Sequence, residues 1–163
     1  MIRSSPSARG RLGGGQKHNP TLTLPLLREG ILLTLLIEVI MSQHSIFITG
    51  AAAGIGAATA RLFAAQGWFV GLFDIDEAGV HRLAQELGAK NCYAAKLDVS
   101  NAEAWQQVLT EFMQHAGRLD VLLNNAGILA SGALEDIPLA RQHQLIDVNV
   151  KGVLNGCYLA LPY

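Results

Sequence analysis

A glycine-rich turn carries the clearest chemical signal in this sequence. Residues 49–56 read TGAAAGIG and directly follow the apolar run at 45–48. A pyrophosphate needs backbone N–H groups and a helix N-terminus aimed at it, and side chains would prevent its close approach. The turn therefore indicates a dinucleotide site, although a tight strand–helix turn that binds nothing could also require these glycines.

A carboxylate lies at the end of the second predicted strand, where a nucleotide-binding site would use one to bind a ribose. Asp74 ends the second predicted strand, 18 residues after Gly56. A carboxylate at this place can accept hydrogen bonds from a ribose diol, and it repels a 2′-phosphate. Ile75 comes next, where a site for NADP would often offer Arg or Lys. These residues favour NAD over NADP. The alternative is a strand-end aspartate that only makes a turn with Asp76.

Two further polar groups follow predicted strands, at the edge where ligands bind in open α/β sheets. Asp98 could contact an adenine amino group while Val99 packs on the ring, or Asp98 could simply lead into a helix cap at Ser100. Residues 124–127 read NNAG, and their small residues suit the close approach of a ligand. The alternative is an asparagine-rich turn that satisfies its own backbone.

Strands and helices alternate from Ser45 onward and would position these groups. The predicted strands are Ser45–Thr49, Phe69–Asp74, 91–97 and 119–123. The predicted helices are 55–66, Glu77–Leu87 and a third that starts at a capping box, with Ser100 as N-cap and Glu103 at N3. Another helical stretch begins at Pro138 and is interrupted by Gly152 and Pro162. This alternation predicts an α/β fold with a Rossmann-type, doubly wound parallel sheet.

The composition argues against several other kinds of site. A net charge of −1 gives no electrostatic footprint for nucleic acid. Cys92 and Cys157 have no partner at metal-ligand spacing, and the histidines are scattered singly, so no metal site is expected. Both cysteines are predicted to be reduced core thiols, which fits a cytoplasmic protein.

Residues 1–40 differ from the rest and are predicted to lie outside the fold, as a disordered or non-native leader. Met41 is the expected biological start. The apolar runs at 21–27 and 31–41 are each shorter than the roughly 20 residues that a membrane span needs. The alternatives are an organelle-targeting leader and a short helix on a membrane surface.

Together these motifs resemble the short-chain dehydrogenase/reductase family. The resemblance covers residues 42–163 and is carried by TGAAAGIG, Asp74, Leu97-Asp98-Val99, NNAG and the VNVKG sequence at 148–152. It implies a pyrophosphate site at Gly50, Ala53, Gly54, Ile55 and Gly56, a ribose site at Asp74, an adenine site at Asp98 and Val99, and further cofactor contacts at Asn124, Ala126 and Gly127. Asn149 matches the asparagine that orders a water in the family's proton relay.

The resemblance implies NAD-linked hydride transfer between an alcohol and a ketone or aldehyde. Family members also carry a catalytic Ser and a Tyr-x-x-x-Lys pair, and neither follows Asn149 here, so domain 41–163 is expected to be truncated and inactive alone. The alternatives are a non-catalytic nucleotide-binding module and a nonfunctional gene fragment. A small-molecule substrate and, for a full-length form, a homo-oligomer are also expected.

Overall fold

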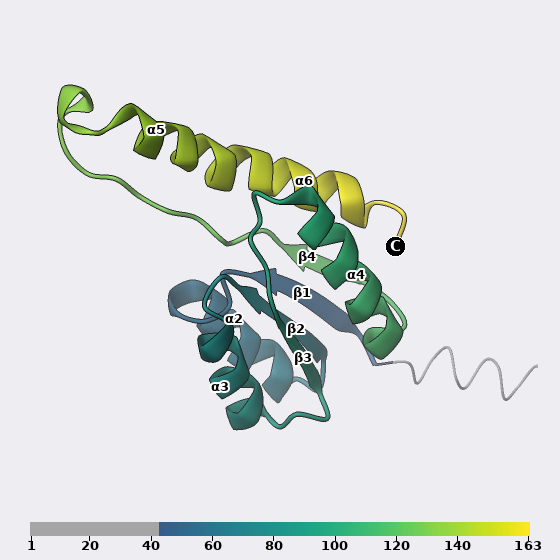
Figure 1. Ribbon diagram of the computed structural model, residues 1–163. Helices are drawn as coiled ribbons and strands as arrows, with labels where there is room; N and C mark the ends of the chain where they lie inside the picture. The colour runs from purple at the N-terminus through teal and green to yellow at the C-terminus, as the bar shows by residue number, and fades with distance from the viewer. Residues whose placement is uncertain (1–42) are drawn as a thin grey trace, which may run out of the picture. The chain divides into compact units, whose positions relative to one another are not determined.

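The apolar runs that the sequence predicts as strands form one four-stranded sheet (Figure 1). The computed structural model describes residues 43–163, and the predictions for residues 1–40 and for a start at Met41 lie outside this range. The strands are β1 (Ser45–Thr49), β2 (Phe69–Asp74), β3 (Cys92–Lys96) and β4 (Val121–Leu123). All pairs are parallel, in the order β3-β2-β1-β4, so the predicted Rossmann-type sheet is confirmed.

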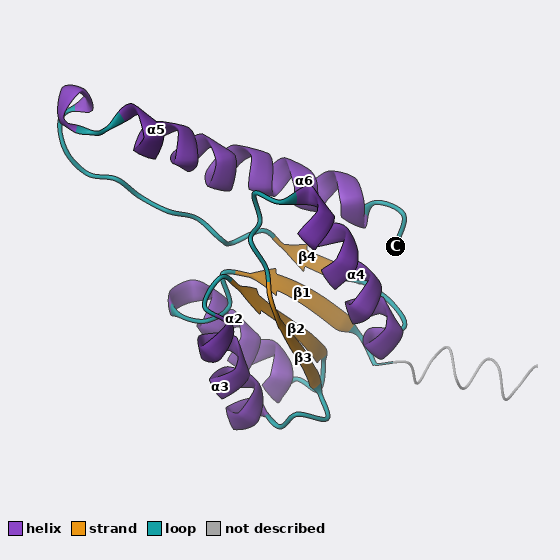
Figure 2. Ribbon diagram, in the orientation of Figure 1, coloured by secondary structure: helices purple, strands orange, loops and turns teal. Residues whose placement is uncertain are grey.

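Helices connect these strands and cover both faces of the sheet (Figure 2). On one face lie α2 (Gly54–Ala65) and α3 (Glu77–Leu87), and on the other lies α4 (Ala102–Ala116). The bounds of β1, β2 and α3 agree with the sequence prediction, because strong apolar periodicity and a terminal turn or glycine mark both ends of each. The bounds of the other elements differ by one or two residues.

The two faces of the sheet contain separate hydrophobic cores, because successive strand residues point to opposite sides. On the α4 face, the ring of Phe47 stacks on Phe73 with centroids 3.8 Å apart and on Trp105 at 5.3 Å. Trp105 is fully buried, and its indole Nε1 donates to the carbonyl of Val99 at 3.0 Å. The core on the α2 and α3 face includes Ile46, Ile48, Val70, Leu72, Val80 and Leu83.

After β4, the chain runs through a short 3₁₀ helix (Leu134–Asp136) into a nearly continuous helical rod. The rod consists of α5 (Leu139–Ile146), a π-helical segment (Asp147–Lys151) and α6 (Gly152–Ala160). The prediction that Gly152 interrupts the helix is wrong, since its φ of −58° and ψ of −44° are helical. Gly152 is needed for packing instead, because a Cβ there would lie 2.7 Å from Val99 Cγ2.

The start of α4 also differs from its prediction. The N-cap is Asn101, whose Oδ1 accepts from the backbone N–H of Ala104 at 3.0 Å, and not Ser100. The hydroxyl and the backbone N–H of Ser100 both donate to Asp98 Oδ1, at 2.7 and 3.0 Å. Because Ser100 is hydrogen-bonded to the Asp98 carboxylate, the next residue, Asn101, caps the helix instead.

The two cysteines have different surroundings. Cys92 is buried as predicted, and desolvation raises the pKa of its thiol. Cys157 is exposed, so the prediction of a core thiol is wrong for this residue. It lies on α6 next to Gly156, and the glycine rather than the cysteine faces α4.

The amino-terminal ends of β1 and β4 are joined through Asp120. The backbone N–H of Ser45 donates to Asp120 Oδ2 at 2.8 Å, His44 Nδ1 lies 3.3 Å from Oδ1, and Arg118 donates to the same carboxylate. Burial by itself raises the pKa of Asp120, but the hydrogen bonds from Ser45, Arg118 and His44 outweigh it and hold the pKa below its ordinary value of 3.8.

Substitution of Asp120 should make the free energy of unfolding depend less on pH under acidic conditions. A carboxylate with a lowered folded-state pKa stabilises the fold above its unfolded pKa of about 3.9, and this contribution is lost as the pH falls through the folded value. We expect Asp120→Asn to be less stable than wild type at pH 6 and to lose less stability between pH 5 and pH 2. Chemical denaturation at each pH measures this. The exposed Asp136→Asn is the matched control, and parallel profiles for Asp120→Asn and wild type would contradict the assignment.

Gly156 should be intolerant of a side chain. A Cβ there would lie 2.4 Å from Asn124 Oδ1 and 2.8 Å from Trp105 Cη2, so Gly156→Ala must push α6 away from α4 and β4. We expect a net loss of about 1–3 kcal/mol in unfolding free energy, even though alanine favours helix. Denaturant titration tests this, with Leu154→Ala on the exposed side of α6 as control. A Gly156→Ala variant as stable as wild type would refute the close packing.

Candidate cofactor site

The glycine turn after β1 is a backbone cradle that admits no Cβ at two of its positions. Gly50 has a φ of +67°, and a Cβ there would lie 2.9 Å from the Cα of Ala126. A Cβ on Gly56, at the start of α2, would lie 2.1 Å from the carbonyl oxygen of Gly50. These two glycines pack the turn tightly against the turn after β4 and the start of α2. The Cβ position of Gly54, the first residue of α2, faces open space, where a phosphate could approach the helix N-terminus.

The turn after β1 is tied to the turn after β4 by Thr49 and Asn125. Thr49 Oγ1 accepts from the backbone N–H groups of Asn125 and Ala126, both at 3.0 Å. In return, Asn125 Nδ2 donates to the carbonyls of Thr49 at 2.9 Å and Gly50 at 3.1 Å. Sequence reasoning did not assign a role to Thr49, although its place directly before the first glycine is a local signal.

Asp74 lies beside the same cradle. Its Oδ2 accepts from the backbone N–H of Ala52 at 3.0 Å, and its Oδ1 accepts from the N–H of Asp76 at 3.0 Å. The turn with Asp76 that was the alternative interpretation therefore exists, and it uses one of the two oxygens. Each carboxylate oxygen can accept more than one hydrogen bond, so both keep capacity for a ligand hydroxyl.

A pocket of about 220 Å³ opens at this edge of the sheet. Six of the sequence-predicted residues line it: Gly50, Asp74, Asp98, Val99, Ala126 and Gly127. The fold thus brings together groups at or just after the carboxyl ends of β1, β2, β3 and β4 that are spread over 78 residues of sequence. Ala53, Gly54, Ile55, Gly56 and Asn124 are not part of this lining. Asn124 is turned toward α6, where its Nδ2 donates to Cys157 Sγ at 3.5 Å.

The lining also contains residues to which the sequence analysis assigned no site role, although it quoted Val148 in the VNVKG motif. Gln144, Asp147 and Val148 reach the pocket from the rod formed by α5 and the π-helical segment. Their spacing of three and four residues places them on one helix face, a signal that the sequence does contain. Asp74, Asp98 and Asp147 make the lining acidic, and it includes no Lys or Arg. Lys151 Nζ donates to Asp147 Oδ1 at 2.6 Å from the next turn.

Asn149 lies in the π-helical segment and holds the chain that follows β4. Its Oδ1 accepts from the backbone N–H of Ile128 at 2.9 Å, and its Nδ2 donates to the Ile128 carbonyl at 2.8 Å. The N–H of Gly152 bonds to the carbonyl of Asp147, five residues back. Single π turns of this kind are frequent at functional sites. The role of Asn149 in a proton relay stays a prediction.

Residues 43–163 show neither a metal centre nor a membrane span. In this range, no three His, Cys, Asp or Glu side chains come close enough to hold a metal ion. No helix in the same range has the length and apolar character needed to cross a bilayer. The cytoplasmic location and the homo-oligomer expected from the sequence stay predictions.

Comparison with known proteins agrees with this geometry. The family model described as short chain dehydrogenase matches residues 44–163. The chain belongs to the short-chain dehydrogenase family. The resemblance seen in the sequence is thereby confirmed, and this is a family of oxidoreductases.

The relatives and neighbours of this short-chain dehydrogenase chain are longer proteins. Sulfoacetaldehyde reductase 2 from Chromohalobacter salexigens is 40% identical over 119 residues, which are 72% of this chain and 47% of that protein. Meso-2,3-butanediol dehydrogenase from Serratia marcescens is 35% identical over 118 residues, with the same two coverages of 72% and 47%. A Burkholderia phymatum short-chain dehydrogenase, solved in complex with NAD, has a TM-score of 0.71 and 31% identity, over 74% of this chain and 44% of that one. The chain thus spans about half the length of these relatives.

Loss of the Thr49 hydroxyl should loosen the pocket. Thr49→Val leaves the N–H groups of Asn125 and Ala126 without their acceptor, at a cost of about 1–3 kcal/mol in unfolding free energy. Thr110→Val is the matched control, because the Thr110 hydroxyl is exposed and donates only within α4, to Gln106 O at 2.8 Å. Denaturant unfolding of both variants measures the difference. Equal losses would show that the link between the two turns is not important for stability.

Proposed function

We propose that this domain binds NAD and forms the cofactor-binding part of an oxidoreductase that transfers hydride between an alcohol and a ketone or aldehyde. The observation that carries the proposal is the position of Asp74, whose carboxylate is anchored to the glycine turn through Ala52 N–H. A ribose acceptor and a pyrophosphate cradle are thereby held side by side. Because the chain spans about half the length of its relatives, the catalytic activity is proposed for the whole protein.

The residues present fit a dinucleotide. Gly50 and Gly56 let the turn pack closely, since a Cβ at either position would collide with protein atoms, and the Cβ position of Gly54 faces open space. The N-terminus of α2 would stabilise the negative charge of the pyrophosphate. Asp98 and Val99 line the part of the pocket next to β3, where the resemblance places adenine. When bound, NAD would supply the hydride acceptor, and this chain would bind and orient it.

The charge of the pocket supports NAD over NADP. A 2′-phosphate carries close to two negative charges at neutral pH and needs a cation nearby. Asp74, the proposed ribose acceptor, would lie near that phosphate, and Asp98 adds negative charge to a described lining without Lys or Arg, while Asp147 is paired with Lys151. Like charges at such distances disfavour binding, so the lining should discriminate against the phosphorylated cofactor.

Residues 128–137 are proposed to form one wall of the substrate site. Asn149 holds this segment at Ile128, and Gln142 Nε2 holds its far end by donating to the carbonyls of Leu134 at 3.2 Å and Ile137 at 2.9 Å. The side chains of Leu129 and Leu134 are 78% and 72% exposed, so the wall offers apolar contacts. A small, largely apolar alcohol or carbonyl compound fits this surface better than a highly charged one.

Titration with both cofactors tests the proposal. We expect wild type to bind NAD at least tenfold more tightly than NADP. Asp74→Ala should weaken NAD binding about tenfold or more, since two hydrogen bonds to a charged group are lost. The same variant should reduce the ratio of the dissociation constant for NADP to that for NAD. Isothermal titration calorimetry measures the dissociation constants, with the exposed Asp136→Ala as control. Equal or tighter binding of NADP by wild type would overturn the NAD assignment.

The two alternative functions that the sequence left open would give different results in binding and activity assays. A non-catalytic nucleotide-binding module would bind NAD but convert no alcohol in an assay that follows NADH formation at 340 nm. A nonfunctional fragment would bind neither cofactor. The proposal therefore requires that this domain bind NAD. It also requires that the whole protein oxidise an alcohol with NAD.

A further inference from the structure

Among the described residues that line the pocket, Gln144 stands out by its free hydrogen-bond donors. Ser100 and Gln144 are the two lining residues whose side chains can donate. The Ser100 hydroxyl already donates to Asp98 Oδ1 at 2.7 Å. The Gln144 side chain is exposed at the pocket, and its Nε2 group donates to no other residue within residues 43–163. In an acidic pocket, this amide is the side-chain group left to meet an acceptor on a ligand.

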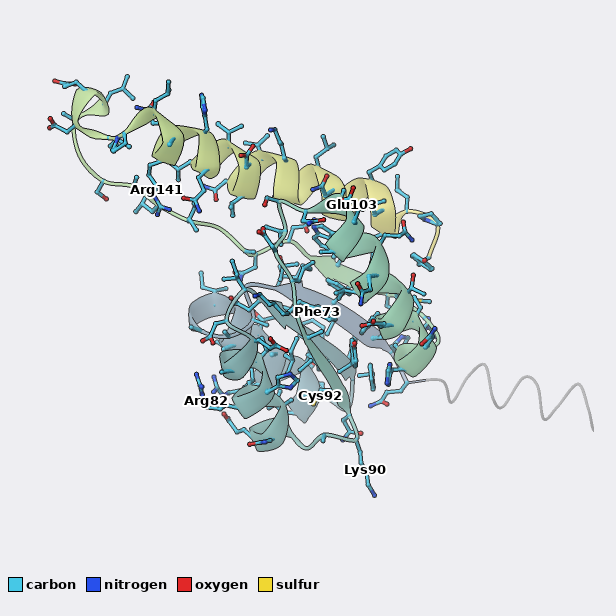
Figure 3. The ribbon with its side chains drawn as sticks, viewed as in Figure 1. Phe73, Arg82, Lys90, Cys92, Glu103 and Arg141 are labelled. Carbon is cyan, nitrogen blue, oxygen red and sulfur yellow. The ribbon has the colours of Figure 1, made fainter. Side chains whose placement is uncertain are left out.

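Arg141 determines which end of the Gln144 amide remains free. Arg141 Nη1 donates to Gln144 Oε1 at 2.7 Å. Because a guanidinium has donors only, it must face the oxygen end of the amide, and Nε2 is left for the ligand. Arg141 Nη2 also donates to the carbonyl of Leu129 at 3.1 Å, so the guanidinium lies between α5 and the segment that precedes it (Figure 3).

The surroundings of Gln144 indicate which part of the ligand it meets. Asp147 and Val148 follow it on the same helix face and line the pocket together with Asp98 and Val99, the expected adenine site. Adenine offers an amino group that donates and ring nitrogens that accept. The carboxylates can pair only with the amino group, because ionised carboxylates have no donors. A ring nitrogen needs a donor, and Gln144 Nε2 supplies one.

We propose that Gln144 is a specificity-determining residue that donates a hydrogen bond from Nε2 to a ring nitrogen of the cofactor's adenine. Arg141 is a positioning residue, which holds the amide in the required orientation and acts only through Gln144. The inference rests on the proposed NAD function and adds a base contact from the α5 rod. Neither residue carries the pyrophosphate or the ribose contacts.

Two ligands separate the contribution of Gln144 from that of Asp98. One is NAD, and the other is the NAD analogue with purine in place of adenine, which lacks the amino group but keeps every ring nitrogen. We expect Gln144→Leu to weaken the binding of both ligands by the same factor, about two- to tenfold, as for one net hydrogen bond. Asp98→Ala should weaken NAD binding much more than binding of the analogue. Gln85→Leu, on the exposed surface of α3, is the matched control and should change neither.

A double-mutant cycle tests the positioning role of Arg141. Lysine keeps the charge but cannot donate to Leu129 and Gln144 in the forked geometry of a guanidinium. Arg141→Lys should weaken NAD binding in the wild-type background and have almost no effect in the Gln144→Leu background. A purely structural role would give the same loss in both backgrounds. Circular dichroism and thermal unfolding confirm that each variant is folded.

The outcomes distinguish this inference from the function on which it rests. If wild type does not bind NAD, the cofactor proposal fails and the inference fails with it. If wild type binds NAD and Gln144→Leu binds it as tightly as Gln85→Leu does, the inference is overturned while the cofactor proposal stands. Additive effects of Arg141→Lys and Gln144→Leu would remove Arg141 from the proposal. The inference is supported in full if Gln144→Leu loses the same factor of affinity for both ligands and if the effects of Arg141→Lys and Gln144→Leu are not additive.

Discussion

The close backbone approach between the turns after β1 and β4 is the constraint on which the rest of the site depends. Asn125 Nδ2 donates to two carbonyls of the first turn, and Thr49 Oγ1 accepts two N–H groups of the second. A Cβ on Gly50 would lie 2.8 Å from that Asn125 nitrogen, so the link requires glycine. The joined turns bring Gly50 of the first turn beside Ala126 and Gly127 of the second, and all three residues line the pocket.

Groups that are expected to touch the ligand also hold the fold together. The Asp74 carboxylate anchors the glycine turn through Ala52 and leads into α3 through Asp76, whose side chain then caps the helix at Gly79 N. Because the Asp74 carboxylate is already bonded to the backbone, it is held in place in the ligand-free protein. A ligand therefore loses little free energy in ordering it, which is the general advantage of a preorganised site.

The helical rod after β4 closes the pocket from the other side. It approaches the sheet closely because Gly152 faces Val99 and Gly156 faces Trp105, where larger residues would collide. Its π-helical segment then presents Asn149 to the backbone of Ile128, while Gln144 and Asp147 line the acidic pocket. One continuous element thus contributes to packing, to the proposed wall of a substrate site and to the proposed contact with the base.

Local patterns in the sequence determined the elements and six of the residues that line the pocket. Apolar runs, helix caps and glycines act over a few residues, so β1, β2 and α3 and the ligand-facing ends of the strands could be predicted. Only the tertiary structure decided which distant groups come together: Thr49 bonds to Asn125, 76 residues away, and Gln144 lines the same pocket as Asp98. It also decided that Gly152 continues a helix and that Cys157 faces outward. These outcomes depend on packing between elements, and the free energy of that packing is not encoded in any short segment.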